Sequence, residues 1–421
     1  MDIETKCLHE GYHPKNGEPQ AMPIYQSTTY RYDSAEHIGK LFDLSVEGHM
    51  YSRISNPTVS FVENKIAALE GGVAALCTTS GQAASMLSIL NIMSAGDHFI
   101  CSSNLYGGTI NLFNVTLKKF GISCTFIDPS ATIEEIQNAF LPNTKAVFGE
   151  TICNPSIAIF DIEKFANIAH EKNVPLIVDN TFATPVLCRP FEFGADIVIH
   201  STSKYMDGHA IQIGGVIVDS GKFNWANGNY PEFTEPDESY HGVVYSRDFK
   251  ESPYITKARV QLMRDFGMYP SANAAFLLNL GLETLGVRMK QYCINAQSVA
   301  EHLAKSKKIE FVNYPTLKSS QYHKLYKKYL KDGCSGVISF SIKGDRETAM
   351  KFMNNLRLAS NVVHVADIRT CVLHPASSTH RQLTDAQLAA SGITPGLIRL
   401  SVGLENINDI IADIDQALDK I

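Results

Sequence analysis

Residues 195–210 read "ADIVIHSTSKYMDGHA". The apolar run ends at His200, and the next four residues are two serines around a threonine, followed by Lys204. A short apolar run bounded by polar residues is typical of a buried β-strand. The sequence therefore predicts a strand whose carboxyl end presents three hydroxyl groups and an amine.

The same kind of run recurs between residues 74 and 219, separated by longer segments with helical periodicity. One such segment places Ile162, Phe165 and Ile168 on one helical face. Alternation of strands and helices is typical of a mostly parallel sheet covered by helices on both faces, so we predict an α/β fold. The predicted strands are AALCTTS, HFICSS, SCTFID, KAVFGET, PLIVDN, ADIVIHS and GGVIVD.

Two further regions flank this block. Residues 1–58 show little helical periodicity and are predicted to form an N-terminal arm. Residues 59–270 then form the large domain, and residues 271–421, which open with a long helical pattern, form a smaller α+β domain. Residues 220–246 contain the only tryptophan, Trp225, and are too long for a plain connection. That length favours a functional or interface loop, with a surface insertion as the alternative.

Composition narrows the class of protein. The chain has 421 residues, 44% of them hydrophobic, and a formal charge of −6, so it has the composition of a globular protein without a basic surface for nucleic acid or anionic membranes. The amino terminus lacks the regions of a signal peptide, and no apolar run has the length of a membrane span. Nine cysteines without a C-x-x-C pair suit reduced thiols. We therefore expect a cytoplasmic protein that acts on small molecules.

Polar side chains follow several of the predicted strands. Asp179 ends PLIVDN, and Lys204 lies 25 positions later, after the next run. Ser80, Gly81 and Gln82 form a turn that opens a helix, whose free N–H groups can bind an anion. Because ligands of α/β sheets bind outside the carboxyl ends of the strands, these residues are expected to share one crevice. A structural ion pair and a simple helix cap are the alternatives for the separate motifs.

Together these groups fit pyridoxal 5'-phosphate. That cofactor requires a lysine for the Schiff base, an acid beside the pyridinium nitrogen and donors for the phosphate. Lys204 and Asp179 supply the first two, and Ser201 and Ser203 add hydroxyl donors near the helix start. Tyr106, after the run HFICSS, offers a ring that can stack on the cofactor.

Several ordered motifs resemble the family of pyridoxal-phosphate enzymes of cysteine and methionine metabolism, which contains cystathionine γ-synthase, methionine γ-lyase and O-acetylhomoserine sulfhydrylase. The resemblance covers nearly the whole chain, and it implies an aspartate-aminotransferase-like fold of type I with a mostly parallel seven-stranded sheet. The motifs are YQSTTY, YSRISNPT, HSTSKY, HPASSTH and GLIRLSVGLE.

The resemblance assigns roles to individual residues. It implies Lys204 as the Schiff-base lysine and a catalytic acid–base group, Asp179 as the pyridinium partner and Tyr106 as the stacking ring. Thr181 is expected to contact the ring. The implied phosphate ligands are Gly81, Gln82, Ser201 and Ser203.

Other implied contacts involve the substrate and a second subunit. Arg399 is expected to hold the substrate α-carboxylate in a bidentate pair. Ser360 and Asn154 are expected to be supporting substrate contacts, with a structural role as the alternative for both, and Glu150 is expected near the cofactor. In this family the tyrosine and arginine of YSRISNP reach the neighbouring subunit's site. Tyr51 (also a substrate contact) and Arg53 therefore imply shared sites in a homotetramer, a dimer of dimers.

The choice of reaction within the family depends on three features. Residues 220–246 and the carboxyl-terminal run from Ser377 resemble segments of O-acetylhomoserine sulfhydrylases. Methionine γ-lyases tend to have a cysteine two places after the stacking tyrosine, where this chain has Gly108. These features favour replacement of the acetate of O-acetyl-L-homoserine by sulfide or methanethiol, giving homocysteine or methionine. A methionine γ-lyase or a cystathionine γ-synthase type of reaction is the alternative.

Competing motifs are weaker. HEGYH, from His9 to His13, fits a zinc-protease pattern, but its Gly11 and the proline after it disfavour the required helix. His364, His374 and His380 share no metal-ligand spacing, so no metal site is predicted, and HPASSTH is expected to shape the second domain beside Arg399. No G-x-G-x-x-G follows the first strand, which disfavours a nicotinamide dehydrogenase. A regulator that binds the cofactor without turnover would have lost a catalytic group, and none is missing.

Overall fold

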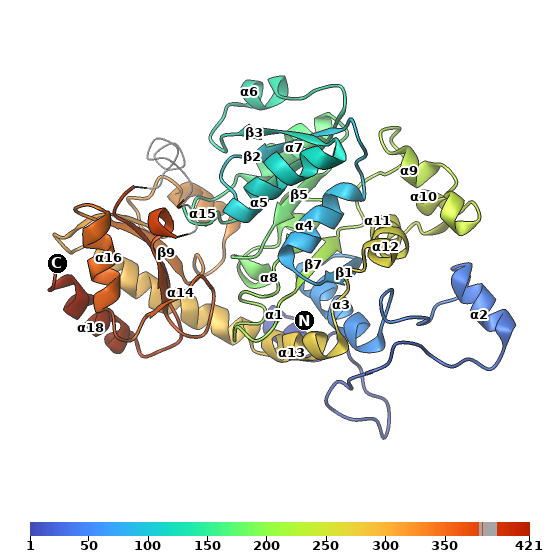
Figure 1. Ribbon diagram of the computed structural model, residues 1–421, viewed down its shortest axis with the longest axis horizontal. Helices are drawn as coiled ribbons and strands as arrows, with labels where there is room; N and C mark the ends of the chain where they lie inside the picture. Colours follow the sequence, from blue (N-terminus) through green and yellow to red (C-terminus); the bar gives the residue numbers. More distant parts are fainter. Residues whose placement is uncertain (379–380, 382–393) are drawn as a thin grey trace.

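A seven-stranded sheet forms the centre of the larger part of the protein (Figure 1). The structure is a computed structural model that describes residues 1–378, 381 and 394–421. The strand order is β1-β7-β6-β5-β4-β2-β3, in which β7 is antiparallel to both neighbours and the other pairs are parallel. The strands are β1 (Ala74–Thr78), β2 (His98–Ser102), β3 (Ser123–Ile127), β4 (Thr144–Glu150), β5 (Leu176–Asp179), β6 (Ile197–His200) and β7 (Gly215–Asp219).

Each of the seven predicted runs forms one of these strands, because a strand covered on both faces must be apolar along its whole length. In β6, Val198 faces one hydrophobic core, whereas Ile197 and Ile199 face the other. The helices on the two sides supply the partners, as Phe165 of α7 and Leu87 of α4 illustrate. The sequence prediction of a sheet between two helical layers is confirmed.

The helices of this larger part begin with good local signals. Asn56 caps α3 with a proline at its first position, and Ser80 caps α4 by accepting a hydrogen bond from the Ala83 N–H group. The helices before residue 270 are α1 (Ile3–His9), α2 (Ala35–Phe42), α3 (Pro57–Glu70), α4 (Gly81–Leu90), α5 (Gly107–Asn111), α6 (Ile133–Asn138), α7 (Ile162–Glu171), α8 (Thr184–Leu187), α9 (Pro231–Thr234), α10 (Tyr245–Asp248), α11 (Pro253–Lys257) and α12 (Arg264–Phe266).

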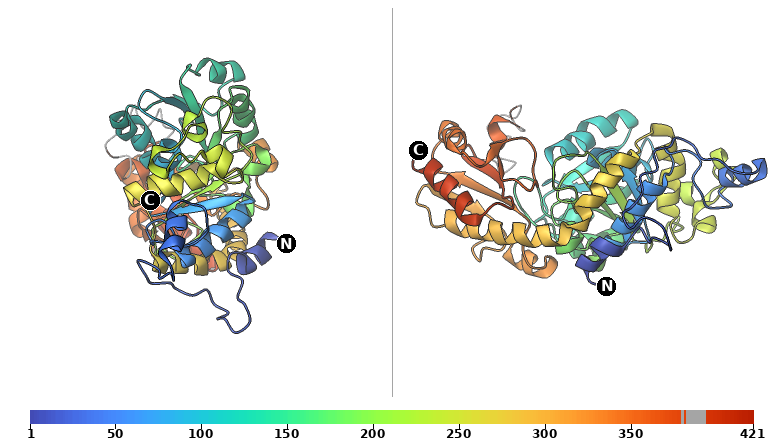
Figure 2. Two further views of the ribbon diagram at one scale, coloured as in Figure 1. Left: turned by 90° about the vertical axis from the view of Figure 1, so that its right-hand side faces the viewer. Right: turned by 90° about the horizontal axis from the view of Figure 1, so that it is seen from below.

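A second sheet of five strands forms the smaller part, in the order β10-β11-β12-β9-β8. Its strands are β8 (Ile309–Asn313), β9 (Val337–Ile342), β10 (Ser360–Asn361), β11 (Cys371–Leu373) and β12 (Leu397–Ser401). The long helix α14 runs between the two parts (Figure 2). The helices after residue 270 are α13 (Ala272–Glu283), α14 (Leu285–Leu303), α15 (His323–Tyr329), α16 (Arg346–Asn355) and α18 (Ile407–Leu418).

The amino-terminal segment extends away from both sheets (Figures 1 and 2). Much of the chain between residues 13 and 50 is exposed, and α2 lies at the far edge of the molecule. A segment that buries little of its own surface has low local stability in the single chain. Across the described ranges 1–378, 381 and 394–421, we find no helix with the length and apolar character needed to span a membrane.

Residues 220–246 fold around Trp225, which is 3% exposed. Its ring lies 4.7 Å from that of Phe233 and 5.0 Å from that of Tyr254, measured between centroids. The aromatic cluster, defined as Phe223, Trp225, Tyr230, Phe233, Tyr245 and Tyr254, packs against the core on one side of the sheet. This segment therefore packs into the core beside the sheet and is not an open loop.

Candidate active site

A cavity of about 720 Å³ lies where the carboxyl ends of the central strands meet the second part of the chain. Its size is that of a site for a cofactor together with a small substrate. Strands β4 and β5 contribute Glu150 and Asp179 from their last positions, and Lys204 comes from the turn after β6. Arg399 of β12 and residues 363–365 form the opposite wall. No residue of the segment 220–246 lines it.

Two carboxyl groups lie side by side because Glu150 and Asp179 are register partners in β4 and β5. Burial raises the pKa of both groups, and the Asp179 charge raises that of Glu150 further. Hydrogen bonds from the backbone N–H (2.9 Å) and hydroxyl of Thr181 to Asp179 Oδ1 oppose that rise at Asp179. Oδ1 is thus occupied, and Oδ2 accepts no hydrogen bond from a described residue, so it can meet a cationic ring nitrogen.

Lys204 is the amine of the cavity. Its Nζ atom makes no hydrogen bond or ion pair with a described residue, although the side chain is largely buried. Burial, followed by the Arg399 charge, lowers the pKa of Lys204 to about 8. A larger fraction of this amine is therefore neutral and nucleophilic near neutral pH than that of a surface lysine.

An anion site is built at the start of α4. A Cβ atom at Gly81 would lie 2.6 Å from the Cβ of Ser201, so only glycine allows the helix start to approach the turn after β6 so closely. The Ser201 N–H donates to Thr181 Oγ1 at 2.8 Å, which leaves the Ser201 hydroxyl toward the cavity. Ser203 also lines the cavity, but its hydroxyl exchanges hydrogen bonds with the Gly214 backbone. First-turn N–H groups and serine hydroxyls are donors suited to a phosphate.

Tyr106 stands at the start of α5 beside the cavity, and the residue is 47% exposed. Its N–H donates to Glu150 Oε1 at 2.6 Å, which fixes the backbone of the tyrosine over the strand ends. A Cβ at Gly108 would lie 2.5 Å from the Tyr106 ring and 2.6 Å from Gln82 Nε2. The absence of a side chain at Gly108 therefore allows the ring and the Gln82 amide to pack together.

Arg399 and Asn154 form a cationic corner. Arg399 Nη1 donates to Asn154 Oδ1 at 3.2 Å, and Nη2 donates to the carbonyl oxygens of Val363 and His364 at 3.1 and 3.2 Å. The Nε atom is buried and has no partner among the described residues. A guanidinium held in this way keeps donors for a carboxylate, and no acidic side chain of the described residues pairs with it.

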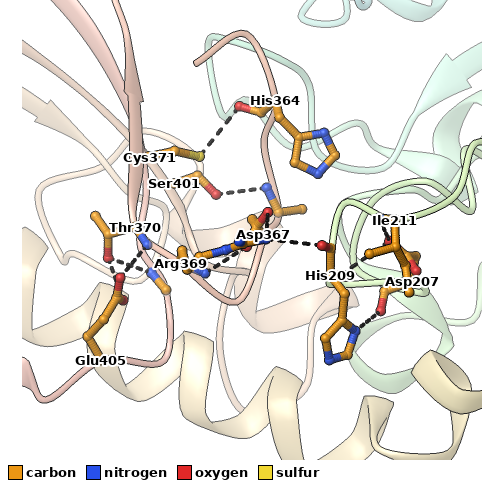
Figure 3. A network of polar contacts seen from close by, with 12 residues as sticks. Asp207, His209, Ile211, His364, Asp367, Arg369, Thr370, Cys371, Ser401 and Glu405 are labelled. Atoms are coloured by element: carbon orange, nitrogen blue, oxygen red, sulfur yellow. Dashed lines mark hydrogen bonds and ion pairs between the residues drawn. The ribbon is translucent and has the colours of Figure 1, made fainter. Parts of the chain in front are cut away.

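The turn after Lys204 is tied to the second part of the chain. Arg369 Nη2 donates to the His209 carbonyl at 3.0 Å (Figure 3). The Ile368 N–H donates to the Gly208 carbonyl at 2.8 Å. Asp367 pairs with Arg369 in the same network. These bonds hold the walls of the cavity, which come from segments far apart in sequence, at a fixed separation.

The structure brings most of the predicted site residues together and separates three. Tyr51 and Arg53 contact each other, with the guanidinium carbon 4.9 Å from the ring centroid, but neither lines this cavity. Ser360 is exposed on β10, because that strand lies at the edge of the second sheet. The residues that line the cavity as predicted are Gly81, Gln82, Tyr106, Asn154, Asp179, Thr181, Ser201, Ser203, Lys204 and Arg399.

Sequence reasoning missed part of the second wall. His364, between Val363 and Val365, lines the cavity, and so do the residues from Ala210 to Ile213. No spacing rule singles out these positions. His374 instead has both ring nitrogens hydrogen-bonded inside the second part, to Ser377 and to the Pro395 carbonyl. His380 lies outside the described residues, together with residues 379 and 382–393 of the carboxyl-terminal run.

The zinc-protease pattern has no helix to support it. Helix α1 ends at His9, and Gly11 adopts a positive φ of 90°, so His9 and His13 do not share one helical face. Within the described ranges, no group of three histidine, cysteine, aspartate or glutamate side chains could hold a metal ion.

The donor set fits pyridoxal phosphate. The amine of Lys204 has no partner among the described residues and suits the aldehyde of that cofactor. One oxygen of Asp179 has no partner among these residues and is free for the ring nitrogen. The close approach of Gly81 and Ser201 forms a place for the phosphate.

Residues 4–419 match the family described as "Cys/Met metabolism PLP-dependent enzyme". The chain belongs to this family. It is 45% identical to the O-acetyl-L-homoserine sulfhydrylase of Leptospira meyeri, over 99% of this chain and 97% of that protein. It is also 45% identical to the homocysteine synthase of Schizosaccharomyces pombe, over 99% and 98% of the two chains.

A solved structure agrees with these matches. The O-acetylhomoserine (thiol)-lyase of Campylobacter jejuni, with a pyridoxyl-lysine monophosphate residue, covers both chains completely, with a TM-score of 0.96 and 38% identity. The family membership, the fold of a type I pyridoxal-phosphate enzyme and the cofactor predicted from the sequence are confirmed. This member of the Cys/Met metabolism family is therefore a pyridoxal-phosphate-dependent enzyme.

Proposed function

We propose that this enzyme replaces the acetate of O-acetyl-L-homoserine by sulfide or methanethiol, giving homocysteine or methionine. The observation that carries the proposal is the pair formed by Lys204 and Arg399 in one cavity. Their charges interact, and both keep free donors toward the space between them. This pair suits an amino-acid substrate, whose amine and carboxylate it can receive. The relatives named above favour γ-replacement as the reaction.

Pyridoxal phosphate, when bound, would supply an electron sink for the substrate α-carbon, and Asp179 would be the partner of its ring nitrogen. Arg399 binds the substrate α-carboxylate through the guanidinium donors that its contacts with Asn154, Val363 and His364 leave free, which orients the α-carbon toward Lys204. Lys204, with its lowered pKa, accepts the α-proton and carries protons between the α- and β-carbons. The Tyr106 hydroxyl assists proton transfer near the γ-carbon, and Asn154 keeps the Arg399 guanidinium in place.

In this proposal the phosphate is held by Gly81, Gln82, Ser201 and Ser203. Thr181 orients the Asp179 carboxylate. The Ser203 hydroxyl would have to turn from Gly214 to contribute a donor. Ser360, which is exposed, has no contact that supports a substrate role.

We also propose that the complete site needs a second subunit. The arm 1–58 is poorly covered, Tyr51 is 40% exposed, and Arg53 Nε is buried without a partner among the described residues. These two side chains would reach the phosphate or substrate bound to the neighbouring subunit. Each subunit would then consist of the arm 1–58, a cofactor-binding domain of residues 59–270 and a smaller domain of residues 271–421. A dimer of dimers and a cytoplasmic location complete the proposal, and the nine free thiols suit a reducing compartment.

The experiment mixes the purified holoenzyme with O-acetyl-L-homoserine, with and without sulfide, and measures homocysteine and 2-oxobutanoate. Homocysteine that depends on sulfide and exceeds 2-oxobutanoate is the expected result. Predominant 2-oxobutanoate in the presence of sulfide would contradict the proposal and make the enzyme a γ-lyase. O-succinyl-L-homoserine in parallel assays defines the acyl preference.

A further inference from the structure

One polar side chain of the cavity has no role in the steps above. His364 lies on the wall opposite the strand ends, and its ring points away from the strands that carry Cys371 and Ser401 (Figure 3). Neither ring nitrogen makes a hydrogen bond with a described residue, and Nε2 is fully buried. Nδ1 is not among the fully buried atoms, so it is the ring nitrogen that a ligand in the cavity can reach.

The backbone around His364 is held firmly. Its carbonyl oxygen accepts from Arg399 Nη2 at 3.2 Å and from Cys371 Sγ at 3.5 Å. Two residues later, the Ala366 N–H donates to Ser401 Oγ at 2.8 Å. The imidazole is therefore presented from a rigid edge of the second sheet, directly beside the residue that binds the substrate carboxylate.

We propose that the His364 imidazole is the base that takes the proton of the incoming sulfur nucleophile. The inference rests on the γ-replacement proposed above. In this step the thiol sulfur forms its bond to the γ-carbon, and its proton moves to an imidazole nitrogen. Acetate has left with the electron pair of the broken C–O bond, and the imidazolium then releases its proton to water. The sum is a substitution without oxidation or reduction.

The charges around His364 suit this role. Three cationic side chains act on the ring, namely Lys204, Arg399 and Arg369. The negative charge of Asp367 opposes their effect on the pKa of His364. Burial and the Lys204 and Arg399 charges lower the pKa of His364 to about 4, so the ring is neutral and able to accept a proton. A substrate carboxylate paired with Arg399 cancels one of these charges. The basicity of His364 therefore rises when the substrate is in place.

The test compares two nucleophiles that differ in ionisation. Sulfide is largely ionised at about pH 8, whereas methanethiol keeps its proton and needs a base. The variant His364→Asn keeps a polar side chain but cannot accept this proton. We expect kcat/KM for methanethiol to fall about tenfold or more beyond any fall for sulfide, as for loss of a general base.

Cys371→Ala is the matched control, because it loosens the same backbone segment and keeps the imidazole. It should change both nucleophile reactions by the same factor. Equal losses for both nucleophiles in His364→Asn would overturn the role of His364 while leaving the γ-replacement intact. A wild-type enzyme that makes no homocysteine or methionine would overturn the proposed function itself.

A second measurement does not depend on turnover. Calorimetric binding of butanoate to the holoenzyme at about pH 6, in buffers of different ionisation enthalpy, counts the protons taken up. Wild type should take up more protons than His364→Asn, or than His364→Gln if the first variant folds poorly. Identical proton uptake in wild type and the folded variant would contradict the coupling between Arg399 and His364.

Discussion

The aromatic cluster and the active-site cavity are both enclosed by the fold, but they treat their polar atoms in opposite ways. In the aromatic cluster, the Tyr230 hydroxyl donates to the Lys145 carbonyl at 2.7 Å and the Tyr254 hydroxyl donates to the Ser88 carbonyl at 2.8 Å. The Tyr245 hydroxyl bonds to Asp237. These three hydroxyl groups therefore have partners within the chain, without any ligand.

In the cavity, Arg399 Nε, Gln82 Oε1 and His364 Nε2 are buried without partners among the described residues. Each such group costs about 1–3 kcal/mol, and the larger of the two hydrophobic cores offsets that cost. Buried polar atoms without partners also occur outside the cavity, as at Glu70 and Tyr292, so they do not by themselves mark a binding site. The contrast teaches that the cavity keeps polar atoms for a ligand, whereas the aromatic cluster uses its tyrosine hydroxyls to hold its own segment in place. Substitutions in the two regions should therefore affect different properties.

The largest expected effect is on turnover. Lys204→Ala removes both the covalent anchor of the cofactor and the proton carrier, so kcat should fall by at least about 10³-fold. The unfolding midpoint should stay near that of wild-type protein without cofactor, because Nζ has no partner among the described residues. Product assays measure kcat, and thermal unfolding followed by circular dichroism measures the midpoint. A variant that keeps a tenth of the activity would refute the assignment.

Trp225→Ala should produce the reverse pattern. Loss of a fully packed indole costs about 3–5 kcal/mol of the free energy of unfolding. The folded fraction should keep its kcat, since residues 220–246 do not line the cavity. Urea unfolding followed by circular dichroism measures the loss, and Trp225→Phe should recover part of it. A fall in kcat without loss of stability would mean that this segment acts on catalysis.

Arg399→Lys should weaken substrate binding more than chemistry. A lysine keeps the charge but loses the bidentate geometry, so kcat/KM should fall about 10- to 100-fold, mainly through KM. Steady-state kinetics with O-acetyl-L-homoserine measures the change. If kcat falls and KM stays constant, Arg399 does not hold the carboxylate in the ground state.

The smallest effect is on the pH dependence of cofactor capture. Because the pKa of Lys204 is lowered to about 8, its neutral amine increases with pH up to that value and is then constant. The rate at which protein without cofactor takes up pyridoxal phosphate should rise about tenfold per pH unit below pH 8 and level off above it. Arg399→Met removes a charge that lowers this pKa and should move the inflection to higher pH. An unchanged inflection would show that burial alone sets the value.

The amino-acid sequence determined the seven strands of the large sheet and the residues at their ends. A strand buried on both faces must be an apolar run, and the carboxyl ends of neighbouring parallel strands meet at one edge. These rules are local, so Lys204, Asp179, Tyr106 and Gly81 could be placed in one crevice before the structure was known. The cofactor followed from the same residues, whereas the family and its type I fold came from the resemblance of ordered motifs along the chain.

Only the tertiary structure decided the second wall of the site. His364 enters the cavity because β10, β11 and β12 pair across some 40 positions and because Arg399 holds the carbonyl oxygens of residues 363 and 364. Ser360, four positions earlier, is exposed at the sheet edge. Neither position has a periodicity or spacing that tells them apart. Contacts between segments distant in sequence, together with the burial they cause, set which histidine faces the substrate and what its pKa is.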